Sequence, residues 1–141
     1  MANFAGESMK FLVTDTGAVE RDLSAYITSV DGLPGDRELR DVTTLGATGR
    51  RRFPGLQDAT ITVEGFFDDT ATSGPDAVLG PLRTDNTART FKFGPKGSTA
   101  GFVRYTGTCL VSNYTVLGQV GGMVLWRLTL GVDGAVTRDT I

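Results

Sequence analysis

The reactive side chains of this sequence leave few ways to build a catalytic site. The 141-residue chain contains no histidine and a single cysteine, Cys109, so neither a Ser-His-Asp nor a Cys-His arrangement is possible. A zinc site is excluded for the same reason, because zinc needs several cysteine or histidine ligands. The carboxylates Glu64, Asp68 and Asp69 are the remaining candidates for acid–base chemistry or an oxygen-ligand metal site. A solvated cluster at a strand end is the favoured interpretation, and no catalytic, metal or cofactor-binding residue is predicted.

Cys109 and Trp126 have structural interpretations. Cys109 lies in an apolar segment, where a cysteine usually acts as a small core residue. Trp126 lies on the apolar side of the last predicted strand and is expected in the core, with a sugar-stacking platform as a minor alternative. The Gly121-Gly122 pair is not followed by the Lys-Ser/Thr of a phosphate-binding loop, which favours a turn.

A basic triplet, Arg50, Arg51 and Arg52, is compatible with nucleic-acid binding or with a protein interface. The formal net charge is −2 and the isoelectric point is about 5.0, whereas a stable duplex binder is normally basic. Binders of single strands also interleave several aromatic residues, and only Phe53 lies nearby. A solvated or interface loop is therefore the favoured interpretation.

The composition indicates one globular domain over residues 1–141. Hydrophobic residues make up 40% and charged residues 21% of the chain, and 19 glycines suggest many tight turns. No apolar run approaches the ~18 residues of a transmembrane helix, so no membrane anchor is expected. The N-terminus lacks the pattern of a signal peptide. Residues 1–9 and 134–141 are expected to be flexible arms.

Alternating apolar and polar residues predict the elements that position these side chains. One face of the strand at 58–67 carries Ile61, Val63 and Gly65, and its other face carries Thr60, Thr62 and Glu64. In the last strand Val124, Trp126, Leu128 and Leu130 face the core, and Arg127 and Thr129 face away. The charged segment 36–55 is predicted as a long polar loop with a short strand at 41–45. The other expected elements are strands at 10–14, 19–23, 25–30, 89–93, 102–117 (bent near 107–109) and 123–132, and a helix at 75–82.

This pattern predicts a mainly β protein, an antiparallel β-sandwich or barrel with one short flanking α-helix. A sheet that exposes its edges would aggregate, and closing the sheets of several copies around a ring removes those edges.

The segment DLSAYITSVDGLPGDRELRDVTTLGATGRRRFPGLQDATITVEGFFDD, residues 22–69, resembles the tail tube proteins of long-tailed bacteriophages. The order of its parts carries the resemblance: a DLSxYI strand, a glycine-rich turn, a charged loop with DVTTLG, a basic cluster, the FPGLxDATI hairpin and a strand ending in EGFFDD. The helix, the long penultimate strand and the final strand with Trp126 follow in the same order, so the resemblance covers residues 10–132. The composite is more specific than any of its single motifs.

The resemblance implies a structural protein without enzymatic activity or cofactor. Such subunits form rings, usually hexamers, whose inner sheets join into one continuous β-barrel, and the rings stack into a hollow tube. The implied partners are further copies of the chain, a tape-measure protein, and tail tip and terminator proteins. DNA passes through the lumen without stable binding. The implied location is the virion tail, after synthesis in the host bacterial cytoplasm.

The resemblance also assigns roles to two sets of residues. The long loop of the family reaches neighbouring subunits, so inter-subunit contacts are expected at Asp36, Arg37, Glu38, Arg40, Asp41, Arg50, Arg51, Arg52 and Phe53. A polar strand face is expected to line the lumen, with Thr60, Thr62 and Glu64 as candidates and Arg127 and Thr129 as weaker ones. A neutral or negative lumen repels phosphates and lets DNA slide, so Arg127 fits there only if an acid pairs with it.

Three other functions stay open. The nearest is another phage tail protein or a head–tail joining protein with a related β fold. A small β-sandwich binding module, for example one for carbohydrates, would need a cleft lined with exposed aromatic residues. A carboxylate-based glycosidase would need two acids at a fixed separation in a cleft, and 141 residues leave little scaffold for one.

Overall fold

A computed structural model describes residues 9–33, 35–46, 48–97, 99–118 and 120–141. Most of the predicted N-terminal arm, residues 1–8, lies outside the described residues. Within the described residues, no helix is long and apolar enough to cross a membrane. The described chain contains nine strands, one short 3₁₀ helix and one α-helix: β1 (Lys10–Thr14), β2 (Glu20–Asp22), η2 (Ser24–Tyr26), β3 (Ile27–Asp31), β4 (Asp36–Asp41), β5 (Arg52–Asp58), β6 (Thr60–Phe66), α1 (Pro75–Leu82), β7 (Arg89–Gly94), β8 (Val103–Leu117) and β9 (Leu125–Thr140).

Seven strands form one antiparallel sheet in the order β2-β1-β7-β8-β9-β6-β3, and β4 and β5 form a separate two-stranded ribbon. The long strands β8 and β9 pair along their whole lengths, from Val103 opposite Thr140 to Leu117 opposite Leu125. Two register shifts interrupt this pairing, one at Gly107 and one at Ser112. Such bulges bend and twist a strand, and the predicted bend near 107–109 is confirmed.

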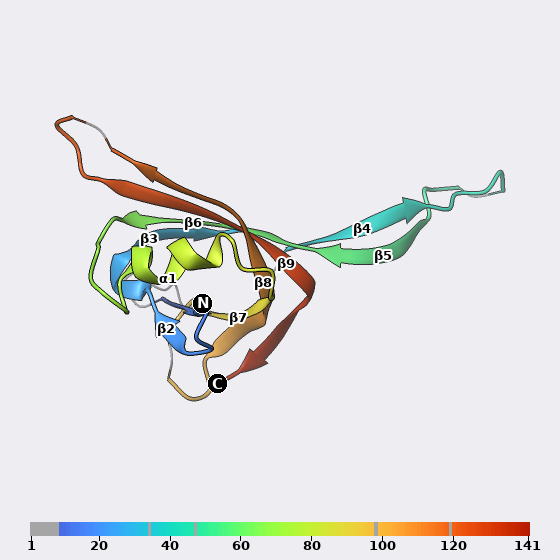
Figure 1. Cartoon of the computed structure of the whole chain (residues 1–141). Coiled ribbons are helices and arrows are strands. Elements are labelled where there is room, and N and C mark those ends of the chain that lie inside the picture. The colour runs from blue at the N-terminus through green and yellow to red at the C-terminus, as the bar shows by residue number, and fades with distance from the viewer. Residues whose placement is uncertain (1–8, 34, 47, 98, 119) are drawn as a thin grey trace.

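The bend divides the large sheet into two parts, because β7 pairs only with residues 105–109 of β8 and β6 pairs only with residues 125–131 of β9. We call the first part the five-stranded half: β2, β1, β7, residues 103–109 of β8 and residues 133–140 of β9. The second part is the four-stranded half: residues 110–117 of β8, residues 125–131 of β9, β6 and β3. The two halves curve around α1 (Figure 1).

The core lies between the two halves. Its members come from both of them and from α1: Phe11, Val13, Leu23, Ile61, Val63, Val78, Leu79, Leu82, Phe91, Cys109, Trp126, Leu128 and Leu130. Gly65 lies against this core, and a Cβ at that position would overlap the carbonyl oxygen of Tyr26 and press on the Trp126 ring. A glycine is therefore needed where Tyr26, the last residue of η2, approaches β6.

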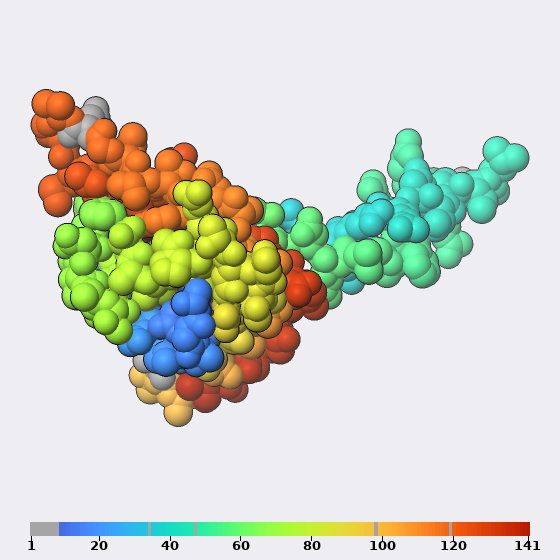
Figure 2. All heavy atoms as spheres, viewed as in Figure 1, coloured from blue at the N-terminus to red at the C-terminus, as the bar shows by residue number. Residues whose placement is uncertain are grey.

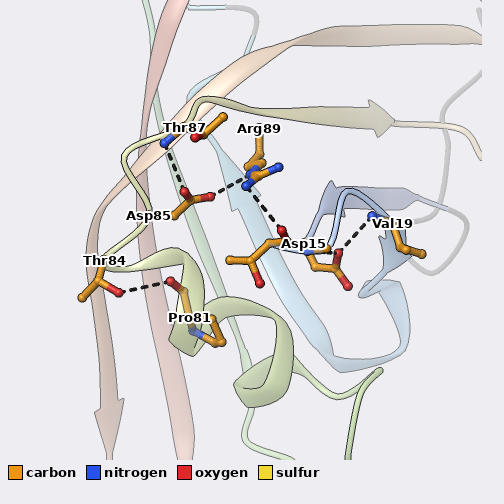
Figure 3. A network of polar contacts seen from close by, with 9 residues as sticks. Asp15, Val19, Pro81, Thr84, Asp85, Thr87 and Arg89 are labelled. Atoms are coloured by element: carbon orange, nitrogen blue, oxygen red, sulfur yellow. Dashed lines mark hydrogen bonds and ion pairs between the residues drawn. The ribbon is translucent and has the colours of Figure 1, made fainter.

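The helix α1 has the predicted bounds. Pro75 occupies its first turn, where a missing N–H costs nothing, and Gly74 is the N-cap residue without a side-chain cap. The loop after α1 is tied to the turn between β1 and β2 through Arg89 (Figure 3). The Arg89 Nε donates to Asp85 at 2.7 Å, and its Nη2 donates to the carbonyl of Thr16 at 3.4 Å. These contacts connect the first residue of β7 to the turn between β1 and β2.

Three expectations from the sequence are wrong. The segment 36–55 is not mainly a loop, because Asp36–Asp41 and Arg52–Asp58 pair as an antiparallel hairpin. Of the strand expected at 41–45, residue 41 ends β4 and the rest lies in the turn of the hairpin. The segment 134–141 is not a loose arm, because β9 continues to Thr140. Val124 does not face the core, because its side chain is 42% exposed. The pairing of β6 with β9 ends at Phe66 opposite Leu125, so Val124 lies beyond the last paired residue of β6.

Candidate functional site

The β4–β5 hairpin projects away from the rest of the molecule (Figures 1 and 2). Along residues 36–58 every described side chain is exposed, except for the half-buried Gly55. All nine residues predicted to make inter-subunit contacts lie on this hairpin: Asp36, Arg37, Glu38, Arg40, Asp41, Arg50, Arg51, Arg52 and Phe53. An arm this exposed buries little within its own chain, so its contribution to folding is small.

Polar contacts inside the hairpin order its end. Arg50 Nη1 lies 2.6 Å from Asp41 Oδ2, and the backbone N–H and hydroxyl of Thr43 both donate to Asp41 Oδ1. These hydrogen bonds from Thr43, together with Arg50, hold the pKa of Asp41 below its usual range. Arg51 and Arg52 form no ion pair within the described residues. Their charges are therefore available to a partner.

The hairpin also exposes apolar side chains. Phe53 is 61% exposed and Leu56 is 78% exposed. Three further large apolar residues on the hairpin and its turn are exposed: Leu39, Val42 and Leu45. Charged residues alone would suit a solvated arm, whereas this concentration of exposed apolar residues indicates an interaction surface.

A polar face covers the outer side of the four-stranded half. Thr60, Thr62 and Glu64 alternate with the buried Ile61, Val63 and Gly65, as predicted. Glu64 lies opposite Arg127, which lies opposite Thr115, and Thr62 lies opposite Thr129, which lies opposite Asn113. Because partners directly opposite in antiparallel strands share a face, these side chains form one surface, here called the polar face.

The cation of the polar face is paired. Arg127 Nη2 lies 2.8 Å from Glu64 Oε1, and its Nε donates to the same oxygen at 2.8 Å. Arg127 therefore has the acidic partner that the lumen hypothesis requires. Next to this pair lies an open groove of about 260 Å³ that crosses all four strands and is lined by Thr28, Glu64, Gly65, Asn113, Thr115, Leu117, Leu125, Trp126 and Arg127.

The outer side of the five-stranded half has the same character. Lys92 pairs with Glu20 at 2.8 Å, and Arg104 pairs with Asp139 at 2.8 Å. The hydrogen bond from Arg104 lowers the pKa of Asp139. Two cations on this surface are thus each matched by an acid.

Four edges of the large sheet have no strand partner in the described chain, and their chemistry differs. The edge of β2 is three residues long and entirely charged, and the edge of β9 at residues 133–140 carries Asp133, Arg138 and Asp139. Short or charged edges of this kind resist pairing with another chain. The other two edges border the four-stranded half. Residues 110–117 of β8 carry no charge, and β3 carries only Asp31 at its end.

The residues considered above as reactive or ligand-binding groups make structural contacts within the chain. Cys109 is buried, and burial raises the pKa of Cys109 to about 12, so the thiol is unreactive at neutral pH. Trp126 is 1% exposed and donates its indole N–H to the carbonyl of Phe66 at 2.9 Å, which makes it a core residue. Asp68 accepts hydrogen bonds from the N–H and hydroxyl of Thr70, which lower its pKa. Glu64 is held by Arg127 instead.

Known structures share this architecture over nearly the whole chain. A chain from the tail of an empty GTA particle, determined with C6 symmetry, has a TM-score of 0.76, with 19% identity over 97% of this chain and 99% of its own. A chain of the SPP1 tail tube has a TM-score of 0.77, with 15% identity over 99% of this chain and 80% of its own. The chain has the phage tail tube fold.

A chain from an extracellular contractile injection system shares the fold as well. A chain in the sheath/tube terminator of the PVC extracellular contractile injection system has a TM-score of 0.72, with 12% identity over 99% of this chain and 98% of its own. No protein-family model and no curated protein matches the sequence. The predicted fold class and the predicted resemblance are confirmed.

Proposed function

We propose that this protein is a structural subunit that assembles side by side into rings, which stack into the hollow tube of a phage-type tail. The observation that carries the proposal is the contrast between the sheet edges. The edges of β2 and of β9 at residues 133–140 are protected by charge, whereas the two edges of the four-stranded half are not. An uncharged edge of eight residues is an aggregation hazard unless a specific partner pairs with it.

Strand direction in the four-stranded half favours a closed ring. The order β3, β6, β9, β8 is antiparallel at every step, so β3 and β8 run in opposite directions. Rotation about an axis along the strands preserves their direction from copy to copy. The free edge of β8 in one copy therefore meets β3 of the next copy in antiparallel orientation. Repeating this contact yields a barrel that has no edge.

The resulting lumen has a suitable size for DNA. The GTA tail has C6 symmetry, and six copies of the four-stranded half supply 24 strands. At about 4.8 Å per strand, the backbone circumference is about 115 Å and the diameter about 37 Å before strand tilt. Inward side chains occupy about 5 Å on each side. An opening of about 27 Å remains, which is on the scale of a duplex.

In this arrangement the polar face lines the lumen. Its threonines and asparagine are neutral, and its arginine is neutralised by Glu64. Phosphates gain no net attraction from such a wall, so DNA passes without stable binding. The proposal includes a tape-measure protein in the lumen before DNA passage and tip and terminator proteins at the ends, all within the virion tail. The β4–β5 hairpin joins one ring to the next.

The test examines the purified full chain by negative-stain microscopy and light scattering over a range of concentrations. Rods of uniform width are expected. The double variant Asn113→Lys with Thr115→Lys places charges beside the β8 edge and should leave folded monomers without rings. The control Thr137→Lys adds charge to an edge that is already charged and should still assemble.

Other outcomes would contradict the proposal. Rings that never stack would indicate a terminator or joining protein. A strict monomer at every concentration, with a ligand in the groove of the polar face, would indicate a binding module.

A further inference from the structure

Large exposed apolar residues gather at two opposite ends of the molecule. One group lies on the β4–β5 hairpin, as described above. The other group surrounds the turn between β8 and β9: Phe66, Val116, Leu117, Val120, Met123 and Val124. Few of the exposed large hydrophobic residues in the described chain lie outside these two groups. Two separate apolar patches on one small protein indicate either two different interfaces or the two complementary surfaces of one repeated interface.

The topology places the two patches at opposite ends. Thr60 pairs with Gly131 at one end of the four-stranded half, and Phe66 pairs with Leu125 at the other. The hairpin leaves the sheet at the Thr60 end, because it connects β3 to β6. The β8–β9 turn extends past the Phe66 end. Figures 1 and 2 show the hairpin and this turn pointing away from each other.

The two ends also carry complementary charge. The turn of the hairpin contains Arg50 and Arg51, Arg52 begins β5, and no acid lies between residues 42 and 52. At the other end, the loop that follows β6 contains Asp68 and Asp69, and no basic residue occurs between residues 65 and 82. The hydrogen bonds from Thr70 lower the pKa of Asp68, so its carboxylate is charged at neutral pH. Asp69 is exposed.

We propose that the β4–β5 hairpin of one copy docks on the opposite end of a second copy, against the β8–β9 turn and the Asp68–Asp69 loop. This contact is heterologous, so each copy uses one surface of each kind and the series continues without limit. Apolar residues of the hairpin cover the apolar turn, and Arg51 and Arg52 lie beside the acids. The inference rests on the proposed tube and names the surface that receives the hairpin.

The dimensions of the hairpin fit this role. The six residues of β4 alone extend roughly 20 Å at about 3.4 Å per residue, and the turn at 42–51 lies beyond them. An arm of this length reaches past the end of its own four-stranded half. A partner stacked along the strand direction is the copy that it meets.

The first experiment reverses one charge on each surface. Arg51→Glu removes a cation that has no ion pair in the described chain, and Asp69→Arg supplies a cation on the receiving side. Each single variant should form rings that fail to stack, and the double variant should recover tubes. Arg138→Glu, the same reversal on β9, should form tubes. If both single variants fail to stack and the double variant forms no tubes either, the proposed contact between Arg51 and Asp69 is wrong.

The second experiment detects the contact directly in assembled protein. Arg51→Cys and Asp69→Cys in one chain should give, under mild oxidation, a ladder of disulfide-linked species with one rung per copy. Each single variant should stay monomeric on a non-reducing gel, and a mixture of the two singles should stop at dimers. Cys109 does not interfere because it is buried. Normal tubes without a ladder would refute the docking surface alone, whereas absence of rings from the unmodified protein would refute the proposed tube and the docking with it.

Discussion

The paired charges on the polar face give a direct test of the lumen assignment. Arg127 is held by Glu64 at 2.8 Å, and the side chains of both residues are exposed, at 65% and 42%. The variant Glu64→Gln keeps the size of the side chain and removes its charge. Because the pair is exposed, its loss should change the stability of the fold by less than about 1 kcal/mol. Assembly should therefore persist while the charge of the lumen changes.

The size of the effect follows from the number of arginines released. Each copy gains one unpaired positive charge, which gives six per ring in the proposed hexamer. Every arginine that contacts a phosphate makes the slope of log K against log salt steeper by about 0.9. A fourfold rise in salt, from about 50 to 200 mM, then weakens DNA binding by about 3.5-fold for each contact. Unmodified tubes should show little binding and little salt dependence.

The assay measures co-sedimentation of a short labelled duplex with preassembled tubes at several salt concentrations. The matched control is Glu20→Gln, which releases Lys92 on the outer side of the five-stranded half from a similar pair at 2.8 Å. Glu64→Gln tubes should retain DNA at low salt, and the control tubes should behave like the unmodified protein. Equal retention by both variants would show that the polar face does not line the lumen.

Three further predictions concern the subunit itself. Leu130→Ala empties a fully buried position and should lower the free energy of unfolding by about 3 kcal/mol, measured by urea titration. Tyr114→Phe removes a hydrogen bond of 3.0 Å from the Tyr114 hydroxyl to Asp76 on α1 and should cost about 1 kcal/mol in the same titration. The hydrogen bond from Arg104 lowers the pKa of Asp139 in the folded state. The charged Asp139 carboxylate therefore stabilises the fold fully above the unfolded-state pKa of about 4, and this stabilisation is lost as the pH falls through the lower pKa of the folded state. Thermal melts between pH 2 and 7 should show a smaller acid-induced decrease for Asp139→Asn.

Local patterns predicted the parts of the fold that local physics determines. The helix at 75–82 follows from a proline in the first turn and from Gly80-Pro81 near its end, and its bounds match. The alternation of Thr60, Thr62 and Glu64 with buried residues was equally clear because each strand face has a single environment. These signals required no knowledge of distant residues.

The β4–β5 hairpin and the end of β9 could not be predicted from their own residues alone. β4 reads DRELRD, which has low β-propensity, and Pro54 argues against a strand in β5. Residues 133–140 contain glycine and several charges, and their partner Val103 lies 37 residues before Thr140. The free edges of the four-stranded half could not be predicted from the sequence for the same reason. A strand is recognised as an edge strand only when the pairing of every strand is known.

The irregularities in the free edges explain how such a surface avoids indiscriminate pairing. Ser112 is an extra residue in β8, between Val111 opposite Leu130 and Asn113 opposite Thr129, and its hydroxyl donates to the Thr129 carbonyl at 3.1 Å. The edge strand β3 carries a register shift of its own, between Ile27 and Ser29.

A bulged edge is locally twisted, so a straight strand cannot pair along its full length. A partner with a matching irregularity fits better. Deletion of Ser112 should therefore straighten the β8 edge, while the buried residues of β9 and β6 keep their pairing and remain packed. The expected result is a folded protein by circular dichroism that forms irregular aggregates in place of rings, seen by negative-stain microscopy. Uniform rings from the deletion variant would show that the bulge plays no part in selecting the neighbouring copy.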